Sequence, residues 1–550
     1  MRWDRVEADA ARRTAGWWPV APALLLFAAI AAISMLPAAM APPMSHDSFW
    51  IDRVWAEQFT HALGRGQLYP RWLPLSFGGL GAPVFYFYAP LSFHITGLFG
   101  LAGLDTYPAL LAAFGATWFG SGATMYLWLR RRARAPAIGA ALYMVLPYHV
   151  IDFYARGALG EFCAFAMVPL VALGLREAAE RSRPLPLALA YGALIMTHLP
   201  TAVIVSTMLI APFSLHHLYT HRTSLRPLAM GVAGGLGSAA VYLLPALTLQ
   251  RHSALGSLWS VRFLQPESWS LLRPDLWGSA SYVLLFAGLA GTTAVAALLL
   301  MRRMPRFWPV WTAAVCLVSA GLIPGFWTLP VMKAVQFPWR SLVLAEFGLA
   351  TVVASYRGSP VIAAAAVTPL LAMSLMMMSP ANPLHGDPMR PLPIPGMQDV
   401  IEYLPPELVD PGREPKLAPI AAAVRAKRDH PTSVFPFPSL RAQCPTGATV
   451  PLQADPTAAH VAAPPPGCSL IVAPLPAERI GWGVSLATWL ILALAGLNNR
   501  AAARTIRPAC RAWIAGWRAA PSAARCRLPW RRPGQQAQVR ASVPARRPWA

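Results

Sequence analysis

The residues of this chain best suited to chemistry begin in one polar loop, 45–90, which follows the first long apolar segment. Asp47, near its start, has the side chain of a general base that takes a proton from a hydroxyl group, or of a metal ligand. Asp47 also suits the cap of the following helix, because Ser-x-Asp sequences often begin helices. Asp52 is a weaker base candidate on a different helical face, and His46 is the other polar candidate beside Asp47.

The remainder of this loop combines a helix, glycines and aromatic side chains. Polar side chains at i, i+4 spacing predict an amphipathic helix up to Leu63, and glycines within 78–81 predict a flexible turn. Further site candidates are Tyr69, Arg71, Tyr86 and Tyr88. Aromatic residues of this kind are typical of a membrane interface. Together these residue types indicate a site for a lipid-linked, hydroxyl-rich substrate.

Two charged residues stand close together in the motif YARGALGEF. Arg156 has a planar guanidinium that suits phosphate oxygens. The alternative interpretation is an interfacial anchor or a partner of Glu161, five residues later. Glu161 in turn suits the start of a helix, where a carboxylate complements the helix dipole.

Three more polar residues lie at predicted membrane edges. His198 interrupts an apolar stretch, where an ionisable side chain is either a hydrogen-bonded packing residue or part of a site. Lys333 and Arg340 flank the motif QFPWR and could neutralise a lipid phosphate. The alternative for both is a cation that reaches to the interface beside an aromatic belt.

Composition places the chain among polytopic membrane proteins. Of its 550 residues 56% are hydrophobic and 13% are charged, and the mean hydropathy is +0.44. The net charge of +23 does not indicate a nucleic-acid partner, because the arginines lie between apolar segments and in one tail. That distribution is the positive-inside pattern, so the arginine-rich loops and both termini are predicted to be cytoplasmic.

The sequence predicts an all-α polytopic membrane protein with about twelve transmembrane helices. The segment 91–104 is short, and we expect a juxtamembrane or re-entrant helix there, within a first outer loop at about 41–107. The expected spans are 17–40, 108–129, 137–151, 161–175, 185–199, 202–218, 227–249, 282–301, 307–323, 342–355, 361–378 and 482–497.

Four parts follow from this pattern. A transmembrane core covers 1–378, a polar outer region 379–479, the last transmembrane helix 480–499, and a basic disordered cytoplasmic tail 500–550. The tail is expected to contact anionic lipid headgroups. Cys444 and Cys468 both lie in the outer region, where an oxidising compartment permits a disulfide.

Several of these stretches resemble a known family. A first span followed by an outer loop with an early acidic residue is similar to the GT-C type membrane glycosyltransferases. The chain is identified as closest to a bacterial group of that superfamily labelled pyruvoyl-tetrahydropterin-synthase-related membrane proteins. The resemblance is carried by HDSFWID, LYPRWLPLSFGGLGAPVFYFYAPL, YARGALGEF, THLPTA, QFPWR and EYLP, from His46 to about Pro405.

The resemblance implies an inverting glycosyltransferase of the bacterial inner membrane that uses a polyprenyl-phosphate-linked sugar to modify an envelope glycan, lipid or protein on the periplasmic side. The activating carboxylate would be Asp47, with Arg156, Lys333 and Arg340 at the donor phosphate. The aromatic residues from Tyr69 to Tyr88 would stack on sugar rings or hold the prenyl chain. Because His46-Asp47 is not a pair of carboxylates, a divalent metal stays an open alternative. A non-catalytic transporter or assembly protein for lipid-linked glycans on the same fold is the alternative function.

Overall fold

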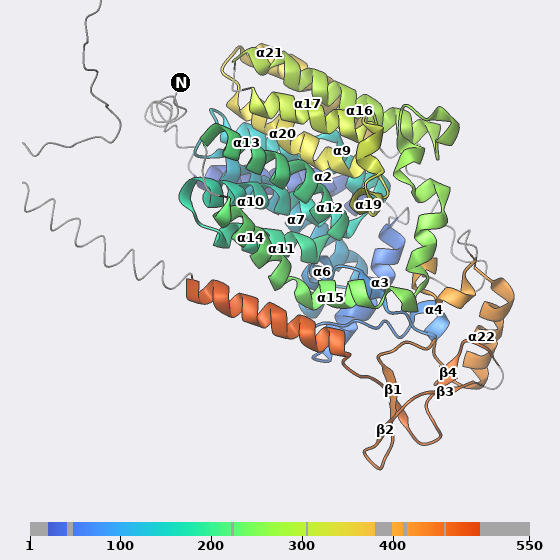
Figure 1. The fold of residues 1–550 in the computed structure, drawn as a ribbon. Coiled ribbons are helices and arrows are strands. Elements are labelled where there is room, and N and C mark those ends of the chain that lie inside the picture. The colour runs from blue at the N-terminus through green and yellow to red at the C-terminus, as the bar shows by residue number, and fades with distance from the viewer. Residues whose placement is uncertain are drawn as a thin grey trace, which may run out of the picture. The chain divides into compact units, whose positions relative to one another are not determined.

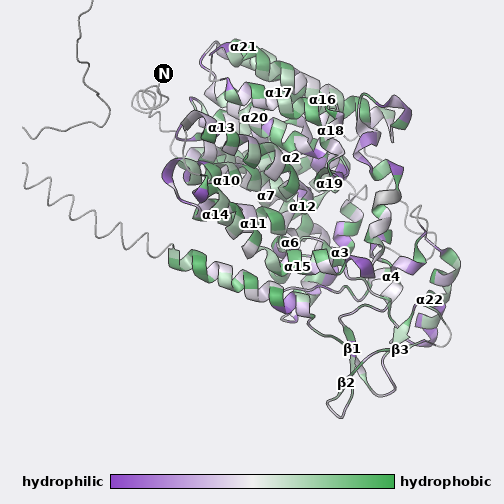
Figure 2. Ribbon diagram, in the orientation of Figure 1, coloured by the Kyte–Doolittle hydropathy of each residue, from purple (hydrophilic) through white to green (hydrophobic). Residues whose placement is uncertain are grey.

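The computed structural model describes residues 20–40, 48–221, 225–303, 306–379, 399–410, 415–455 and 458–495. Helices packed side by side make up most of it (Figure 1), and apolar residues predominate on them (Figure 2). Residues 1–492 form one compact unit, and the rest of the chain forms another. His46, Asp47 and the whole of the basic tail 500–550 lie outside the described residues.

The described part of the first half of the chain is mostly helical. Its elements are α2 (Val20–Met40), α3 (Phe49–Gly64), α4 (Ser76–Gly79), α5 (Val84–Phe87), α6 (Leu91–Leu101), α7 (Thr106–Leu129), α8 (Pro136–Val145), α9 (Pro147–Ile151), the π-helix η1 (Asp152–Arg156), α10 (Leu159–Arg181), α11 (Leu185–Thr197), α12 (Leu199–Val205), the π-helix η2 (Ser206–Ile210) and α13 (Ala211–His221).

The second half adds further helices, short 3-10 turns and a few strands. The α-helices are α14 (Arg226–Ser238), α15 (Ala240–Thr248), α16 (Ala280–Leu299), α17 (Phe307–Ser319), α18 (Pro324–Trp327), α19 (Pro330–Lys333), α20 (Leu342–Ser355), α21 (Pro360–Met377), α22 (Leu417–Asp429) and a last helix Pro476–Ala495. The 3-10 turns used below are η3 (Gln250–His252), η9 (Pro338–Ser341), η10 (Ile401–Tyr403) and η11 (Pro406–Leu408).

Among the described residues, length and composition qualify seven helical segments as membrane spans, or eight if the bent pair α14 and α15 is one span. The expectation of a polytopic all-α core is confirmed, whereas the count of twelve stays a prediction. The difference comes partly from short helices. Three expected spans are α11, α17 and α20, with 13, 13 and 14 residues, which is less than the 17 or so that cross a bilayer without help.

Burial separates central helices from peripheral ones. Each span has a most apolar window of 18 residues. In this window 83% of the residues are buried for Pro136–Arg156 and 72% for α10. The share is 28% for α2 and for α21, and 17% for Pro476–Ala495. Apolar side chains that stay exposed on the peripheral helices are suited to contact with lipid.

One of the central spans is broken by a proline, and the break is repaired from another helix. Pro147 ends α8 and begins α9, which leaves backbone N–H groups at the start of α9 without helical acceptors. Glu346 of α20 supplies the acceptors: its carboxylate binds the N–H groups of Tyr148 at 2.6 Å and His149 at 3.2 Å. This arrangement holds the end of the span, where the candidate site begins.

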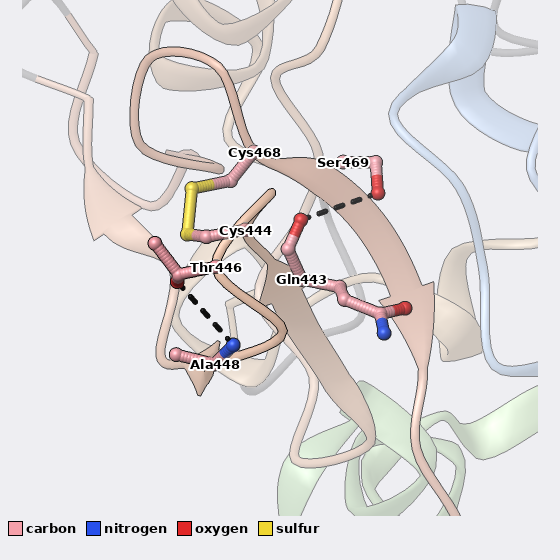
Figure 3. The surroundings of a disulfide bond; sticks show 6 residues. All are labelled: Gln443, Cys444, Thr446, Ala448, Cys468 and Ser469. Atoms are coloured by element: carbon pink, nitrogen blue, oxygen red, sulfur yellow. Dashed lines mark hydrogen bonds between the residues drawn. A yellow bond between two sulfur atoms is a disulfide. The ribbon is translucent and has the colours of Figure 1, made fainter.

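The outer region contains two small sheets, one of three strands and one of two, which the sequence did not predict. Strand β1 (Leu440–Gln443) pairs antiparallel with β2 (Thr449–Val450) and with β5 (Ser469–Val472), while β3 (Gln453–Ala454) pairs with β4 (Ala462–Ala463). Gln443 lies opposite Ser469, so Cys444 and Cys468 continue this pairing, and the structure joins them by a disulfide (Figure 3).

The outer region is tied to the first loop by specific contacts. The indole Nε1 of Trp55 on α3 donates to Asp399 at 3.0 Å, and Phe435 N donates to the Leu80 carbonyl at 2.8 Å. Burial raises the pKa of Asp399 to about 6, although the hydrogen bonds it accepts act in the opposite direction. The first loop and the outer region therefore pack as one surface.

Candidate functional site

The site is built on a tight turn within the motif YARGALGEF. The π-helix η1 ends at Gly157, whose φ of 58° is in the left-handed region that favours glycine. A Cβ at this position would lie 2.6 Å from Phe49 Cβ, so the close approach of α3 also requires glycine. The turn sends the chain directly into α10, so Arg156 and Glu161 extend from its two arms.

The centre of the site is the buried carboxylate of Glu161, which is 1% exposed. Arg156 Nη1 lies 2.8 Å from one of its oxygens, and Arg340 Nε lies 3.0 Å from the same oxygen. The Tyr148 hydroxyl donates to the other oxygen. Two guanidinium groups and a phenol thus surround one carboxylate, which is the charge-paired arrangement that a buried acid requires.

Asp152 extends this cluster on the side of Arg156. Its carboxylate, buried completely, accepts a bond of 2.7 Å from Arg156 Nη1. Arg156 is therefore shared between two carboxylates, and Arg340 balances the second negative charge. The charges of these four groups sum to zero. The cluster is therefore neutral as a whole, and a ligand can interact with it only at an exposed atom.

Arg340 is the member of the cluster that reaches toward an exterior. Its Nε binds Glu161, and its Nη1 donates to the Val335 carbonyl at 2.8 Å. Its Nη2 has no hydrogen-bond partner within the described part of the chain, and its side chain is 11% exposed. A guanidinium fixed at two nitrogens and open at the third is suited to a charge-assisted bond with an anion.

The first loop borders the same cluster at the start of α3. Ser48 N donates to the Arg156 carbonyl at 2.9 Å, and Ser48 directly follows Asp47 in the chain. Asp52, 1% exposed, accepts the Leu159 N–H at 3.0 Å and so caps the start of α10. Asp52 therefore has a structural role, and its contacts do not support a role as a general base.

Tyr88 and His198 flank the beginning of α10. A Cβ added at Gly160 would lie 3.3 Å from the Tyr88 hydroxyl and 3.5 Å from His198 Cδ2. His198 interrupts the helix between α11 and α12 with an extended conformation, and its Nδ1 lies 2.8 Å from the Thr201 hydroxyl. Both predicted candidates therefore lie beside the Glu161 cluster.

Three other candidates of the first loop lie elsewhere. Arg71, 6% exposed, donates to the Val241 carbonyl at 2.8 Å, lies 3.5 Å from Glu478, and stacks 3.9 Å above the ring of Tyr69. Tyr86 is completely buried and packs on Phe437 with ring centroids 4.9 Å apart. Packing against the last helix and the outer region encloses Arg71 and Tyr86, so neither forms an open surface. That the aromatic residues from Tyr69 to Tyr88 stack on sugar rings or hold the prenyl chain stays a prediction.

The remaining candidates do not add to the described cluster. Lys333 is exposed on α19, and its side chain makes no hydrogen bond or ion pair with any described residue, in contrast to Arg340. His46 and Asp47 lie outside the described residues. Where the structure is described, no group of three or more His, Cys, Asp or Glu side chains is placed to hold a metal ion, and Asp152 and Glu161 face arginine.

The sequence analysis missed Tyr148, Asp152 and Glu346. Asp152 lies four residues before Arg156, which is ion-pair spacing on a helix and was a usable signal. Tyr148 offered no signal of its own. Glu346 is a lone carboxylate in an apolar segment, which raises the expectation of a function but does not reveal its partners.

The cluster lies at one end of the helix bundle. On α10, Glu161 is near the beginning, and Glu180 at the far end pairs with Arg132. At 1.5 Å per residue these two positions are about 28 Å apart, close to the ~30 Å of a bilayer hydrocarbon core. The site therefore lies at the membrane edge opposite the arginine-rich loops.

Proteins similar to this chain are found among solved structures and in one protein family. No curated protein matches the chain. Two solved structures of arabinofuranosyltransferase AftD from Mycobacteria, one of them a mutant, are similar with TM-scores of 0.42 and 0.40 and identities of 18% and 17%. The matches cover 64% and 63% of this chain but only 27% and 26% of the AftD chains. This chain spans about a quarter of their length.

A family comparison gives the remaining finding. Residues 85–271 match the family described as "6-pyruvoyl-tetrahydropterin synthase related domain; membrane protein". The matched stretch supplies Tyr88, Arg156, Glu161 and His198. Over residues 85–271 the chain is thus similar to the members of this membrane-protein family.

Proposed function

We propose that this chain is an inverting membrane glycosyltransferase that takes a sugar from a polyprenyl-phosphate-linked donor. It transfers the sugar to an envelope acceptor at the outer edge of the membrane that the helices span. The observation that carries the proposal is Arg340, fixed by Glu161 and Val335, with its Nη2 open at that edge. A departing lipid phosphate needs positive charge that is already oriented, because preorganised donors stabilise charge as it develops.

The reaction assigns one role to each group. The acceptor oxygen forms a bond to the anomeric carbon of the donor, the bond from that carbon to the phosphate oxygen breaks, and polyprenyl phosphate leaves beside Arg340. The acceptor proton passes to a carboxylate. Asp52, Asp152 and Glu161 already accept hydrogen bonds from protein groups, so we assign the proton to Asp47. Glu161 and Arg156 are positioning residues for Arg340.

A non-catalytic role in transport or assembly of lipid-linked glycans is the second candidate. It is favoured by the same observation, that the described carboxylates already accept hydrogen bonds from protein groups. A network of paired charges can hold a lipid phosphate without catalysing a reaction. The two candidates differ in whether a glycosidic bond forms while the protein is present.

The test uses the full chain in lipid nanodiscs with radiolabelled polyprenyl-phosphate sugars and an envelope extract as acceptor. The enzyme hypothesis expects label in the acceptor together with an equal release of polyprenyl phosphate. Movement of intact donor across a vesicle bilayer without label transfer would instead support the transport hypothesis. Failure of every donor in both assays would overturn the proposal.

A further inference from the structure

A cavity of about 390 Å³ opens in the outer region, apart from the Glu161 cluster. Five chain segments line it: the turn η3 after α15, the prolines around η11, the strand β1 with the residues before it, the residues 451–452, and Ala462 of β4. The lining side chains used below are Arg251, His252, Glu407, Phe437 and Arg441. Its volume is within the range of small-ligand sites, about 300–1,000 Å³.

The walls of this cavity are held by contacts between distant segments. Ala254 N donates to the Leu404 carbonyl at 2.9 Å, which fixes the 3-10 turn that follows η3 (Ala254–Ser260) against the end of η10. The Phe437 ring packs between His252, at 6.2 Å, and Tyr86, at 4.9 Å. The Cys444–Cys468 disulfide joins β1 and β5 just beyond the strand that carries Arg441 (Figure 3). The cavity is therefore built by the fold, and no single loop forms it.

Its lining combines flat apolar surfaces with open cationic groups. Five prolines and Phe437 supply C–H and aromatic faces: Pro405, Pro406, Pro436, Pro438 and Pro451. Arg251 uses only Nε, which donates to His252 Nε2 at 3.2 Å, and Arg441 uses only Nη1, which donates to the Leu440 carbonyl. Their other guanidinium nitrogens have no partner among the described residues.

The charge of the cavity follows from this geometry. An arginine can only donate, so His252 Nε2 must accept, and the imidazole is neutral with its proton on Nδ1. Burial, assisted by the positive charge of Arg251, lowers the pKa of His252, which favours the neutral ring. Arg251 and Arg441 then outweigh Glu407, and the cavity presents a positive charge beside surfaces on which a sugar ring can lie.

We propose that this cavity binds a saccharide unit that carries a carboxylate or a phosphate. The two arginines would hold the anionic group, Glu407 would accept hydrogen bonds from hydroxyls, and Phe437 with the prolines would support the ring. That this unit belongs to the acceptor glycan rests on the proposed function, whereas binding itself does not.

The cavity has a structural connection to the candidate site. Tyr403, two residues before Pro405 of the cavity, stacks on Phe87 with ring centroids 6.4 Å apart and also contacts Trp55 of α3. Tyr88, next to Phe87, borders the Glu161 cluster. An acceptor held in the cavity would thus lie on the same side of the protein as the proposed transfer.

The experiment measures binding to the full chain in nanodiscs of neutral phosphatidylcholine. The probes are tetragalacturonate, a phosphorylated mannose and neutral maltotetraose. Calorimetry measures the binding of each probe. We expect at least one anionic probe to bind about tenfold more tightly than maltotetraose. Preference for tetragalacturonate identifies a uronic acid, and preference for the phosphorylated mannose identifies a phosphate-bearing sugar.

Variants locate the binding. Arg251→Gln and Arg441→Gln should each weaken the preferred probe about tenfold, and Phe437→Leu should weaken all probes while keeping the core filled. Arg273→Gln is the matched control, since Arg273 is a half-exposed arginine paired with Asp275 outside the cavity. Equal loss in the control, equal binding of maltotetraose, or no anionic binding would overturn the proposal.

The proposed function can fail separately. Anionic binding without sugar transfer would leave the cavity in place and remove the acceptor interpretation. Sugar transfer that persists without any anionic binding would overturn the inference about the cavity alone.

Discussion

Arg340 Nε donates to Glu161 at 3.0 Å although 179 residues separate the two in the chain. This bond joins the motif QFPWR to the motif YARGALGEF at the start of α10, with Arg156 on the same carboxylate oxygen. Each motif by itself reads as an interfacial anchor. Because Arg156 and Arg340 both bind the buried carboxylate of Glu161, the two motifs form a single site.

Arg340→Ala should reduce use of the lipid-linked donor, because it removes the open guanidinium and leaves Glu161 with Arg156 and Tyr148. Loss of one charged hydrogen-bond partner is worth about 1.5–3 kcal/mol, or roughly ten- to hundredfold in kcat/KM. Arg340→Lys should recover part of the activity if charge alone matters and little if the fork geometry matters. Donor kinetics and the thermal unfolding midpoint would be measured together.

Lys333→Ala is the matched control for that experiment. Lys333 is a cation on the neighbouring helix α19, exposed and without a described partner, so its removal should leave donor kinetics unchanged. A larger loss in Lys333→Ala than in Arg340→Ala would move the phosphate site to α19.

Apolar patterning predicted most of the helical framework. The expected segments 108–129, 185–199 and 361–378 correspond to α7, α11 and α21 with ends within a few residues, and α6 is the short helix expected at 91–104. These agreements follow from local hydrophobicity. The 68° bend between α14 and α15, within one expected span, has no equally clear local signal.

The site was predictable in part for the same reason. Arg156, Glu161, His198 and Arg340 were predicted as polar residues at span ends, and Tyr88 was predicted as an aromatic residue of the first outer loop. The structure brings them together. Glu346 was not found because its partners are backbone N–H groups freed by Pro147, nearly 200 residues away. The burial of Arg71 and Tyr86 was not predicted, because a sequence does not show that the outer region covers them.

A pH dependence is expected from Asp399. Burial raises its pKa from the ordinary 3.8 to about 6, so the folded protein binds this proton more tightly than the unfolded chain does. Stability should therefore fall as the pH rises from about 4 to 6 and stay constant above that range. Asp399→Asn should remove this fall and gain about 3 kcal/mol at neutral pH.

Thermal unfolding midpoints from pH 4 to 8 would test the role of Asp399, with Asp429→Asn as an exposed control at the end of α22. Parallel curves for the wild type and Asp399→Asn would contradict it.

Cys444 and Cys468 should be disulfide-bonded in protein made with its outer region in the periplasm. The bond closes a loop of 24 residues, for which chain-entropy arguments give about 3 kcal/mol. Cys444→Ser should lower the stability of the sheet and weaken probe binding at Arg441 on β1. Identical gel mobility with and without reductant, together with full thiol labelling, would rule the bond out.

Both termini should be cytoplasmic, because arginines cluster at the helix ends opposite the Glu161 cluster. Reporter fusions at Arg134 and after Arg500 should be active in the cytoplasm, and a fusion at Pro431 should be active in the periplasm. A periplasmic signal at Arg134 would invert the placement of the candidate site.

Asp47→Asn should abolish sugar transfer while the protein still folds and inserts. Asn keeps the shape and the capping oxygen of Asp, so a purely structural cap at this position should survive the change. A general base should not survive it, because the amide cannot take the acceptor proton, and the expected loss is about 10²–10⁴ in rate. Transfer of label from the lipid-linked donor is the measurement, with complementation of a surface-glycan defect as the assay in cells.

The matched control for Asp47→Asn is Asp52→Asn, five residues further along the chain. Asp52 caps α10 through the Leu159 N–H, and an Asn side chain offers the same acceptor, so activity should fall little. Asp52→Ala should lower stability by about 1 kcal/mol instead, since it leaves that N–H without a partner. Full activity of Asp47→Asn, or a collapse of activity in Asp52→Asn without loss of folding, would transfer the role of base from Asp47 to another carboxylate.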